Sequence, residues 1–258
     1  MTARHPVVRA LWTAYEVLAM AFGLGALAAI CLAWLPGALL LHPLLPGRLG
    51  KLVGRAAIAG GFRLYLRLLG TVCACRFDID ELDRLRTAGP LVVVANHPSL
   101  LDAVLILSRL PDAVCVMKAS LMDNVLFGAS ARLARYIRNN APLEMILKAR
   151  EELQSGAQLL IFPEGTRTTD FPIGKCLPSA GLIARRAGVP VQTLLIEFST
   201  PYLGKAWPLF RRPQLPLTCR IRLGRRFPPP ADVAAFTREL DAYFRSELGD
   251  SAPSTATA

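Results

Sequence analysis

The stretch LVVVANHPSLLD, residues 91–102, joins five aliphatic residues directly to the polar turn Asn96-His97-Pro98. Gly89-Pro90 bounds the aliphatic run on its other side, a pattern typical of a short strand buried on both faces. A predicted helix over residues 100–110 and a second apolar run, residues 113–117, give the strand, helix, strand order of a parallel sheet. We therefore predict an α/β fold whose mixed, largely parallel sheet is flanked by helices.

The spacing of His97 and Asp102 suits a general base and the carboxylate that orients it. In one continuous helix this offset, at about 100° per residue, would turn the two side chains roughly 140° apart. Pro98 instead keeps His97 extended and starts a helix whose first turn carries Asp102. A carboxylate that accepts the Nδ1 proton raises the basicity of the other ring nitrogen, which can then deprotonate a hydroxyl. The alternative is a histidine that caps the turn beside an acid favoured by the helix dipole.

A second motif, LLIFPEGTR, occupies residues 159–167 and again places polar residues after a short apolar strand. Gly165 lets the backbone approach an anion, Thr166 offers a hydroxyl, and Arg167 can grip two phosphate oxygens. Glu164 can hold the arginine or accept a hydrogen bond from a substrate hydroxyl. These four residues are candidate substrate-binding groups, and the alternative is an ordinary turn with a solvated arginine.

Together, NHPSLLD and LLIFPEGTR resemble the two main signatures of the glycerolipid acyltransferases, the family that includes 1-acylglycerol-3-phosphate acyltransferase. The resemblance covers about residues 51–224. It implies that His97, assisted by Asp102, takes the proton of a lysophospholipid hydroxyl, which attacks the thioester of acyl-CoA or acyl carrier protein. This co-substrate is the acyl donor, and no further cofactor and no covalent enzyme intermediate are implied. Backbone N–H groups near the start of the helix at Pro98 are expected to stabilise the oxyanion.

The resemblance also implies an arginine that contacts the acceptor phosphate at the end of a short strand, residues 136–138. The glycine common in this motif is replaced near Arg135, so Arg135 and Arg138 are both candidates for substrate binding, and a surface arginine without a role is the alternative. Ser179 and Thr193 replace a usual glycine and proline, which bears on the shape of the pocket. The acceptor is therefore 1-acylglycerol-3-phosphate or, as alternatives, a lyso-ornithine lipid, another lysolipid or a polyene lipid. An inactive, basic, membrane-binding homologue is the alternative of another class.

Composition indicates a membrane rather than nucleic acid as the partner of this basic chain. The formal net charge is +11 over 258 residues, which permits either partner. Val17–Leu35, however, contains no charge and is long enough to cross the hydrocarbon layer. Basic residues cluster after this segment, so we expect the catalytic domain on the cytoplasmic side of the cytoplasmic membrane. An amphipathic helix over residues 51–70 either lies among anionic headgroups or packs as an ordinary domain helix.

Three regions are expected along the chain: membrane-anchoring helices in residues 1–70, an acyltransferase catalytic domain in residues 71–248 and a disordered tail in residues 249–258. Pro36-Gly37 and Pro43 are expected to break the apolar segment, which leaves either one membrane span or a helix that enters and returns. Six cysteines form no CxxC pair, so no metal site is predicted. His97 is the one histidine outside the N-terminal segment.

Overall fold

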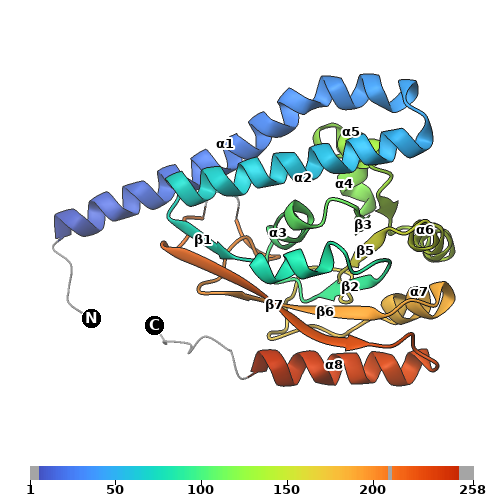
Figure 1. Ribbon diagram of the computed structural model, residues 1–258. Helices are drawn as coiled ribbons and strands as arrows, with labels where there is room; N and C mark the ends of the chain where they lie inside the picture. Colours follow the sequence, from blue (N-terminus) through green and yellow to red (C-terminus); the bar gives the residue numbers. More distant parts are fainter. Residues whose placement is uncertain (1–5, 209–210, 250–258) are drawn as a thin grey trace.

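Helices cover both faces of a seven-stranded sheet in the computed structural model, which describes residues 6–208 and 211–249 (Figure 1). The strands are β1 (Cys75–Asp78), β2 (Val92–Ala95), β3 (Ala113–Met117), β4 (Ile137–Arg138), β5 (Gln158–Ile161), β6 (Val191–Phe198) and β7 (Leu217–Phe227). The helices are α1 (Pro6–Leu44), α2 (Gly47–Val72), the 3₁₀ helix η1 (Asp80–Leu85), α3 (Asp102–Arg109), α4 (Ala119–Asp123), α5 (Val125–Leu133), α6 (Pro142–Gln154), α7 (Ser179–Ala187) and α8 (Val233–Gly249).

The strand order is β1-β7-β6-β2-β5-β3-β4. Strand β2 pairs in parallel with β5 and β6, and β3 pairs in parallel with β5 and β4. The long β7 pairs antiparallel with β6 and parallel with β1. The predicted mixed, largely parallel sheet is therefore confirmed, and the strand that leads into His97 lies at its centre.

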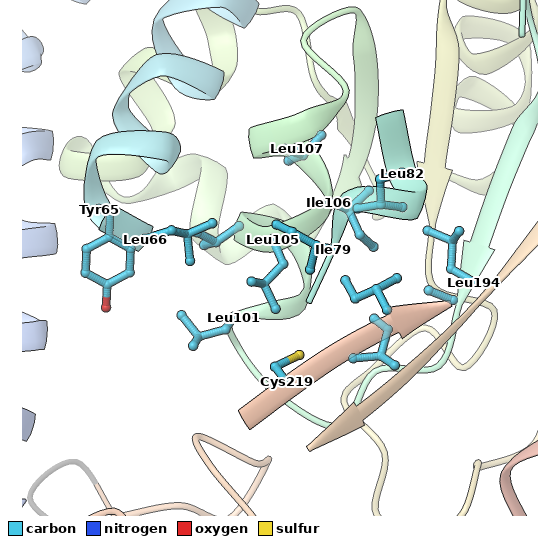
Figure 2. Packing of buried hydrophobic residues seen from close by; sticks show 14 of the residues in the cluster. Tyr65, Leu66, Ile79, Leu82, Leu101, Leu105, Ile106, Leu107, Leu194 and Cys219 are labelled. Atoms are coloured by element: carbon cyan, nitrogen blue, oxygen red, sulfur yellow. The ribbon is translucent and has the colours of Figure 1, made fainter. Parts of the chain in front are cut away.

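Alternate residues of β2 serve the two faces of the sheet, as the pleat of a strand requires. Val93 and Ala95 pack with η1, α2 and α3, while Val92 and Val94 pack with α6, α7 and α8. Figure 2 shows the first of these cores, in which Leu105 and Ile106 of α3 belong to the same cluster as Leu194 of β6. All four residues of β2 are buried. Burial on both sides explains why the strand is apolar throughout, and it fixes the position of the turn that follows.

The N-terminal segment differs from the sequence expectation, because α1 runs unbroken through Pro36, Gly37 and Pro43. A proline removes only one backbone donor from the helical ladder, and packing of the helix can hold the remaining bonds. Such packing is present here: Ala38 is fully buried against Leu133 and its neighbours in α5. The chain reverses after α1, and α2 returns beside it as the second arm of a helical hairpin (Figure 1).

Several element boundaries also differ from the predictions. The sequence of residues 175–187 predicts a helix, but α7 begins at Ser179, because the N–H groups of Cys176 and Leu177 bond to Asp241 and to the Pro163 carbonyl instead. The sequence predicts a helix and a loop over residues 121–134, whereas the structure has two helices there, α4 and α5. The sequence predicts a last strand over residues 217–223, but β7 continues to Phe227. Residues 250–258 of the predicted disordered tail lie outside the described residues.

Candidate active site

The turn between β2 and α3 brings His97 and Asp102 together. Nδ1 of His97 lies 2.8 Å from Oδ2 of Asp102, and the same oxygen accepts a hydrogen bond of 2.8 Å from the N–H of Ser99. Asp102 is the first residue of α3, while His97 precedes Pro98 in the non-helical turn. The chain thus achieves the facing geometry that a continuous helix would prevent.

Asp102 is fully buried, and its second oxygen, Oδ1, has no hydrogen-bond partner among the described residues. Burial raises the pKa of Asp102 to about 6, while the hydrogen bonds from His97 and Ser99 act in the opposite direction. A desolvated carboxylate of this kind interacts strongly with a nearby donor, because water does not compete for it. The geometry therefore directs the Nδ1 proton of His97 toward Asp102 and leaves Nε2 as the acceptor nitrogen.

The imidazole of His97 stacks on Phe162, which directly follows β5. The ring centroids are 3.8 Å apart, and the planes are inclined by 12°. The side chain of His97 is 16% exposed, and within the described part of the chain no hydrogen bond engages its Nε2. The ring is therefore held on one side and open at the nitrogen that a general base needs. We did not predict this contact, although the parallel pairing of β2 and β5 is the signal that brings their carboxyl ends together.

Glu164 braces the turn at His97, and within the described residues it forms no hydrogen bond with Arg167. Its Oε1 accepts hydrogen bonds from the His97 N–H at 3.0 Å and the Thr168 hydroxyl at 2.7 Å, and its Oε2 accepts from the Gly174 N–H at 2.8 Å. These contacts differ from the expectation that Glu164 holds the arginine fork or meets a substrate hydroxyl. Thr168 adds a bond of 2.7 Å from its own N–H to the His97 carbonyl. No local spacing in the sequence pointed to Thr168.

Asn96 fixes the other side of the same turn. Its side-chain amide donates to the carbonyl of Ile196 at 2.9 Å and accepts from the N–H of Ile196 at 2.8 Å. Asn96 is buried, so these bonds satisfy polar groups that water cannot reach. These two bonds brace the turn against β6.

The structure explains why residue 165 is a glycine and shows which atoms Arg167 contacts. Gly165 adopts a φ of +69°, and a Cβ there would lie 2.9 Å from the Leu177 side chain, so both conformation and space favour glycine. Nη1 of Arg167 donates to the carbonyls of Leu203 at 2.9 Å and Gly204 at 2.8 Å. No hydrogen bond among the described residues engages its Nε or Nη2. That edge of the guanidinium, with the exposed Thr166 beside it, can receive an anion.

The structure also separates the two candidate arginines of the short strand. Arg138 ends β4, at the same edge of the sheet as His97 but on a different strand, and its guanidinium forms a bidentate pair with Asp123 at 2.9 Å for both bonds. Arg135 has a φ of +55°, in the left-handed region that glycine adopts without strain. Its guanidinium lies next to Gly47, at the start of α2. Of the two, Arg138 is the one placed at the carboxyl edge.

The N–H groups after Pro98, which we expected to serve the oxyanion, are already engaged. Ser99 donates to Asp102, Leu100 to the Leu203 carbonyl and Leu101 to the hydroxyl of Ser99. The tight turn needed to aim Asp102 at His97 uses these donors internally. In the PEGTR turn, by contrast, the N–H groups of residues 166 and 167 have no partner among the described residues. No group of three or more His, Cys, Asp or Glu side chains in residues 6–208 and 211–249 can hold a metal ion.

Comparison with known families assigns the chain to one of them. The model of the Acyltransferase family matches residues 63–197, more than half of the chain, and the chain therefore belongs to that family. Similar proteins include the 1-acyl-sn-glycerol-3-phosphate acyltransferase of Pseudomonas aeruginosa, 23% identical over 237 residues, 88% of this chain and 89% of that protein. A probable 1-acyl-sn-glycerol-3-phosphate acyltransferase of Mycoplasma genitalium is 32% identical over 133 residues, 48% of each chain.

A solved structure supports the same fold. The crystal structure of the 1-acyl-sn-glycerophosphate acyltransferase PlsC from Thermotoga maritima is similar with a TM-score of 0.68 and 19% sequence identity. The similarity covers 95% of this chain and 98% of that one, so it includes the N-terminal helices as well as the sheet.

Proposed function

We propose that this acyltransferase moves a fatty acyl group from acyl-CoA or acyl carrier protein to the hydroxyl of a lysophospholipid, with 1-acylglycerol-3-phosphate as the first candidate acceptor. One observation carries the proposal. His97 and Asp102 are paired at 2.8 Å at the carboxyl end of the central strand, and no hydrogen bond from the described residues engages Nε2 of His97. The names of the relatives from Pseudomonas and Mycoplasma supply the choice of acceptor.

The proposed reaction needs one base that later acts as an acid. Nε2 of His97 takes the proton of the lysolipid hydroxyl as its oxygen attacks the thioester carbonyl and forms the new C–O bond. The imidazolium that results is stabilised by the buried carboxylate of Asp102, which accepts from Nδ1. When the tetrahedral intermediate collapses, the C–S bond breaks and His97 returns the proton to the thiolate. Phe162 and Glu164 act as positioning residues, because they hold the ring and the backbone of His97.

The acceptor phosphate is proposed to lie at the PEGTR turn. Gly165 and Thr166 are exposed there, and the Nε and Nη2 edge of Arg167 points to no protein partner among the described residues. Arg138 is proposed as a second phosphate contact from the same edge of the sheet. Its pairing with Asp123 is solvent-exposed on both sides, and such pairs are worth at most about 1 kcal/mol, so a phosphate can replace Asp123.

Helix α1 is proposed to hold the enzyme at the cytoplasmic membrane by lying in one leaflet, within an anchoring region of residues 1–70. It is long and apolar enough to cross a membrane. One face is nevertheless committed to the catalytic domain, where Glu16 accepts hydrogen bonds from Arg212 at 3.1 Å and from the Leu215 N–H at 3.2 Å. The opposite face exposes large apolar side chains such as Leu18 and Leu40. Because α1 is held along the domain in this way, a segment that enters the membrane and returns to the same side is favoured over one that spans it once.

Purified protein in lipid vesicles, given radiolabelled acyl-CoA or acyl carrier protein and a panel of lysolipids, tests this function. We expect labelled diacyl product, with 1-acylglycerol-3-phosphate as the best acceptor. If product formed only from a lyso-ornithine lipid or another lysolipid, the proposed acyltransferase activity would stand and the proposed acceptor would be replaced. Absence of product with every donor and acceptor would support the inactive homologue.

A further inference from the structure

Four arginines line a cavity on the side of the domain that faces away from His97. The cavity has a volume of about 310 Å³ and is bordered by Arg63 and Arg67 of α2, Arg86 after η1 and Arg109 of α3. Its apolar lining includes Leu66 and Ile79, which also belong to the hydrophobic core shown in Figure 2. We call it the arginine cavity. Its base is part of the packed core, so the arginines extend from rigid elements.

The arginine cavity is separate from the candidate active site. Strand β1 runs parallel to β7, β7 antiparallel to β6, and β6 parallel to β2, so β1 runs opposite to β2. Ile79 follows the carboxyl end of β1 and therefore lies toward the edge of the sheet where β2 begins. Helix α3 leads from Asp102 to Arg109, and its seven steps of 1.5 Å carry Arg109 about 10 Å along the axis from the catalytic pair.

The charges around the arginine cavity are not balanced within the described residues. Arg109 pairs with Asp80 at 2.6 Å and with Asp83 at 2.8 Å. No ion pair or side-chain hydrogen bond of residues 6–208 and 211–249 engages the other three arginines. Several unpaired guanidinium groups around one cavity repel each other, and an anion between them removes that repulsion. Guanidinium groups match the geometry of phosphate oxygens, so a phosphate is the anion that this arrangement suits best.

The surroundings of the arginine cavity indicate where the phosphate comes from. Arg63 and Arg67 lie one turn apart on α2, and Leu64 between them is 49% exposed. Helix α2 lies beside the long apolar helix α1 (Figure 1). A phospholipid can therefore place its phosphate among the arginines and its acyl chains along the helical hairpin. A cationic headgroup would be repelled by the same arginines, which favours an anionic phospholipid.

We propose that the arginine cavity binds a phosphate group, and that in a membrane this group belongs to the headgroup of an anionic phospholipid. The site orients the domain on anionic membranes from a position distant from the catalytic pair. It does not depend on the proposed acceptor, and its test measures binding rather than activity.

The test uses full-length protein in neutral detergent micelles, titrated with phosphatidylglycerol or with phosphatidylcholine. Lipid retention is followed by native mass spectrometry and by the melting temperature, which rises as a ligand occupies the folded state. The variant carries Arg63→Gln, Arg67→Gln and Arg86→Gln. A matched control carries Arg185→Gln, Arg186→Gln and Arg238→Gln, which remove the same charge from exposed positions on α7 and α8.

Each basic residue near anionic lipid contributes roughly fivefold to affinity. We therefore expect the cavity variant to bind phosphatidylglycerol about 100-fold more weakly and the control to stay within about threefold of wild type, with no saturable binding of phosphatidylcholine. Equal losses in both variants would overturn the proposal in favour of diffuse attraction. Tighter saturable binding of inorganic phosphate or adenosine 3′,5′-bisphosphate than of the lipid would assign the site to a soluble phosphate and overturn the lipid source. Should the triple variant fail to fold, the single Arg67→Gln variant must show the roughly fivefold loss.

Discussion

Replacement of Glu164 by glutamine separates a bracing role from a substrate contact. The carboxylate accepts three hydrogen bonds, from the His97 N–H, the Thr168 hydroxyl and the Gly174 N–H. A glutamine has one acceptor oxygen, and placing it toward His97 keeps two of these bonds. Its NH₂ group then faces the Gly174 donor, which loses its partner. A lost charge-assisted bond and an unsatisfied, partly buried donor cost about 1.5–3 kcal/mol.

For a chain of this size, the loss lowers the melting temperature by roughly 3–12 °C. Because Glu164→Gln keeps the contact to His97, we expect kcat to stay within about tenfold of wild type, whereas Glu164→Ala removes that contact and costs about 10²-fold. The acceptor KM should not change in either variant. Glu151→Gln, at an exposed position of α6, is the matched control and should be neutral. A normal melting temperature together with a raised acceptor KM in Glu164→Gln would refute the bracing role.

The site and the anchor give three further predictions. Because burial raises the pKa of Asp102 to about 6 and the ionised carboxylate is the required acceptor, kcat/KM should fall as the pH drops through about 6, and a profile flat to pH 5 would contradict this. Arg167→Lys should lower kcat/KM for a phosphate-bearing acceptor by about 10- to 150-fold. Hydrolysis of the acyl donor without acceptor should stay normal in this variant. An equal fall in the rate of donor hydrolysis would mean that Arg167 acts only through its hydrogen bond to the Leu203 carbonyl and not through the acceptor. Membrane-bound protein should resist a high-salt wash, because α1 binds through apolar surface, and release by salt would assign binding to charge.

The central part of the fold could be predicted because its signals are local. Short apolar runs bounded by turn residues indicated β2, β3 and β5, and their burial on both faces explains why alternation was absent. The path of α1 could not be predicted by the same means. Pro36 is a reliable local signal for a break, but packing of Ala38 against α5 depends on residues almost a hundred positions away.

The candidate site shows the same division. His97 and Asp102 were predicted to meet because one proline between them fixes the local path of the chain. Glu164 belonged to a visible motif, but its contact with the His97 N–H joins residues 67 positions apart, and no spacing rule covers that distance. The stacking of Phe162 on the imidazole depends on the register of β2 against β5. The sequence therefore predicted the pair that we propose as reactive, and the sheet determined what supports it.

The most direct test of the proposed mechanism is the rate of acyl transfer by His97→Ala, measured beside wild type and the control His42→Ala. His42 lies near the end of α1, so the control removes an imidazole without touching the proposed site. We predict that His97→Ala lowers the rate by about 10² to 10⁴ while the protein still folds and associates with membranes, and that His42→Ala remains active. Acyl transfer by folded His97→Ala at a rate near that of wild type would contradict the proposed mechanism.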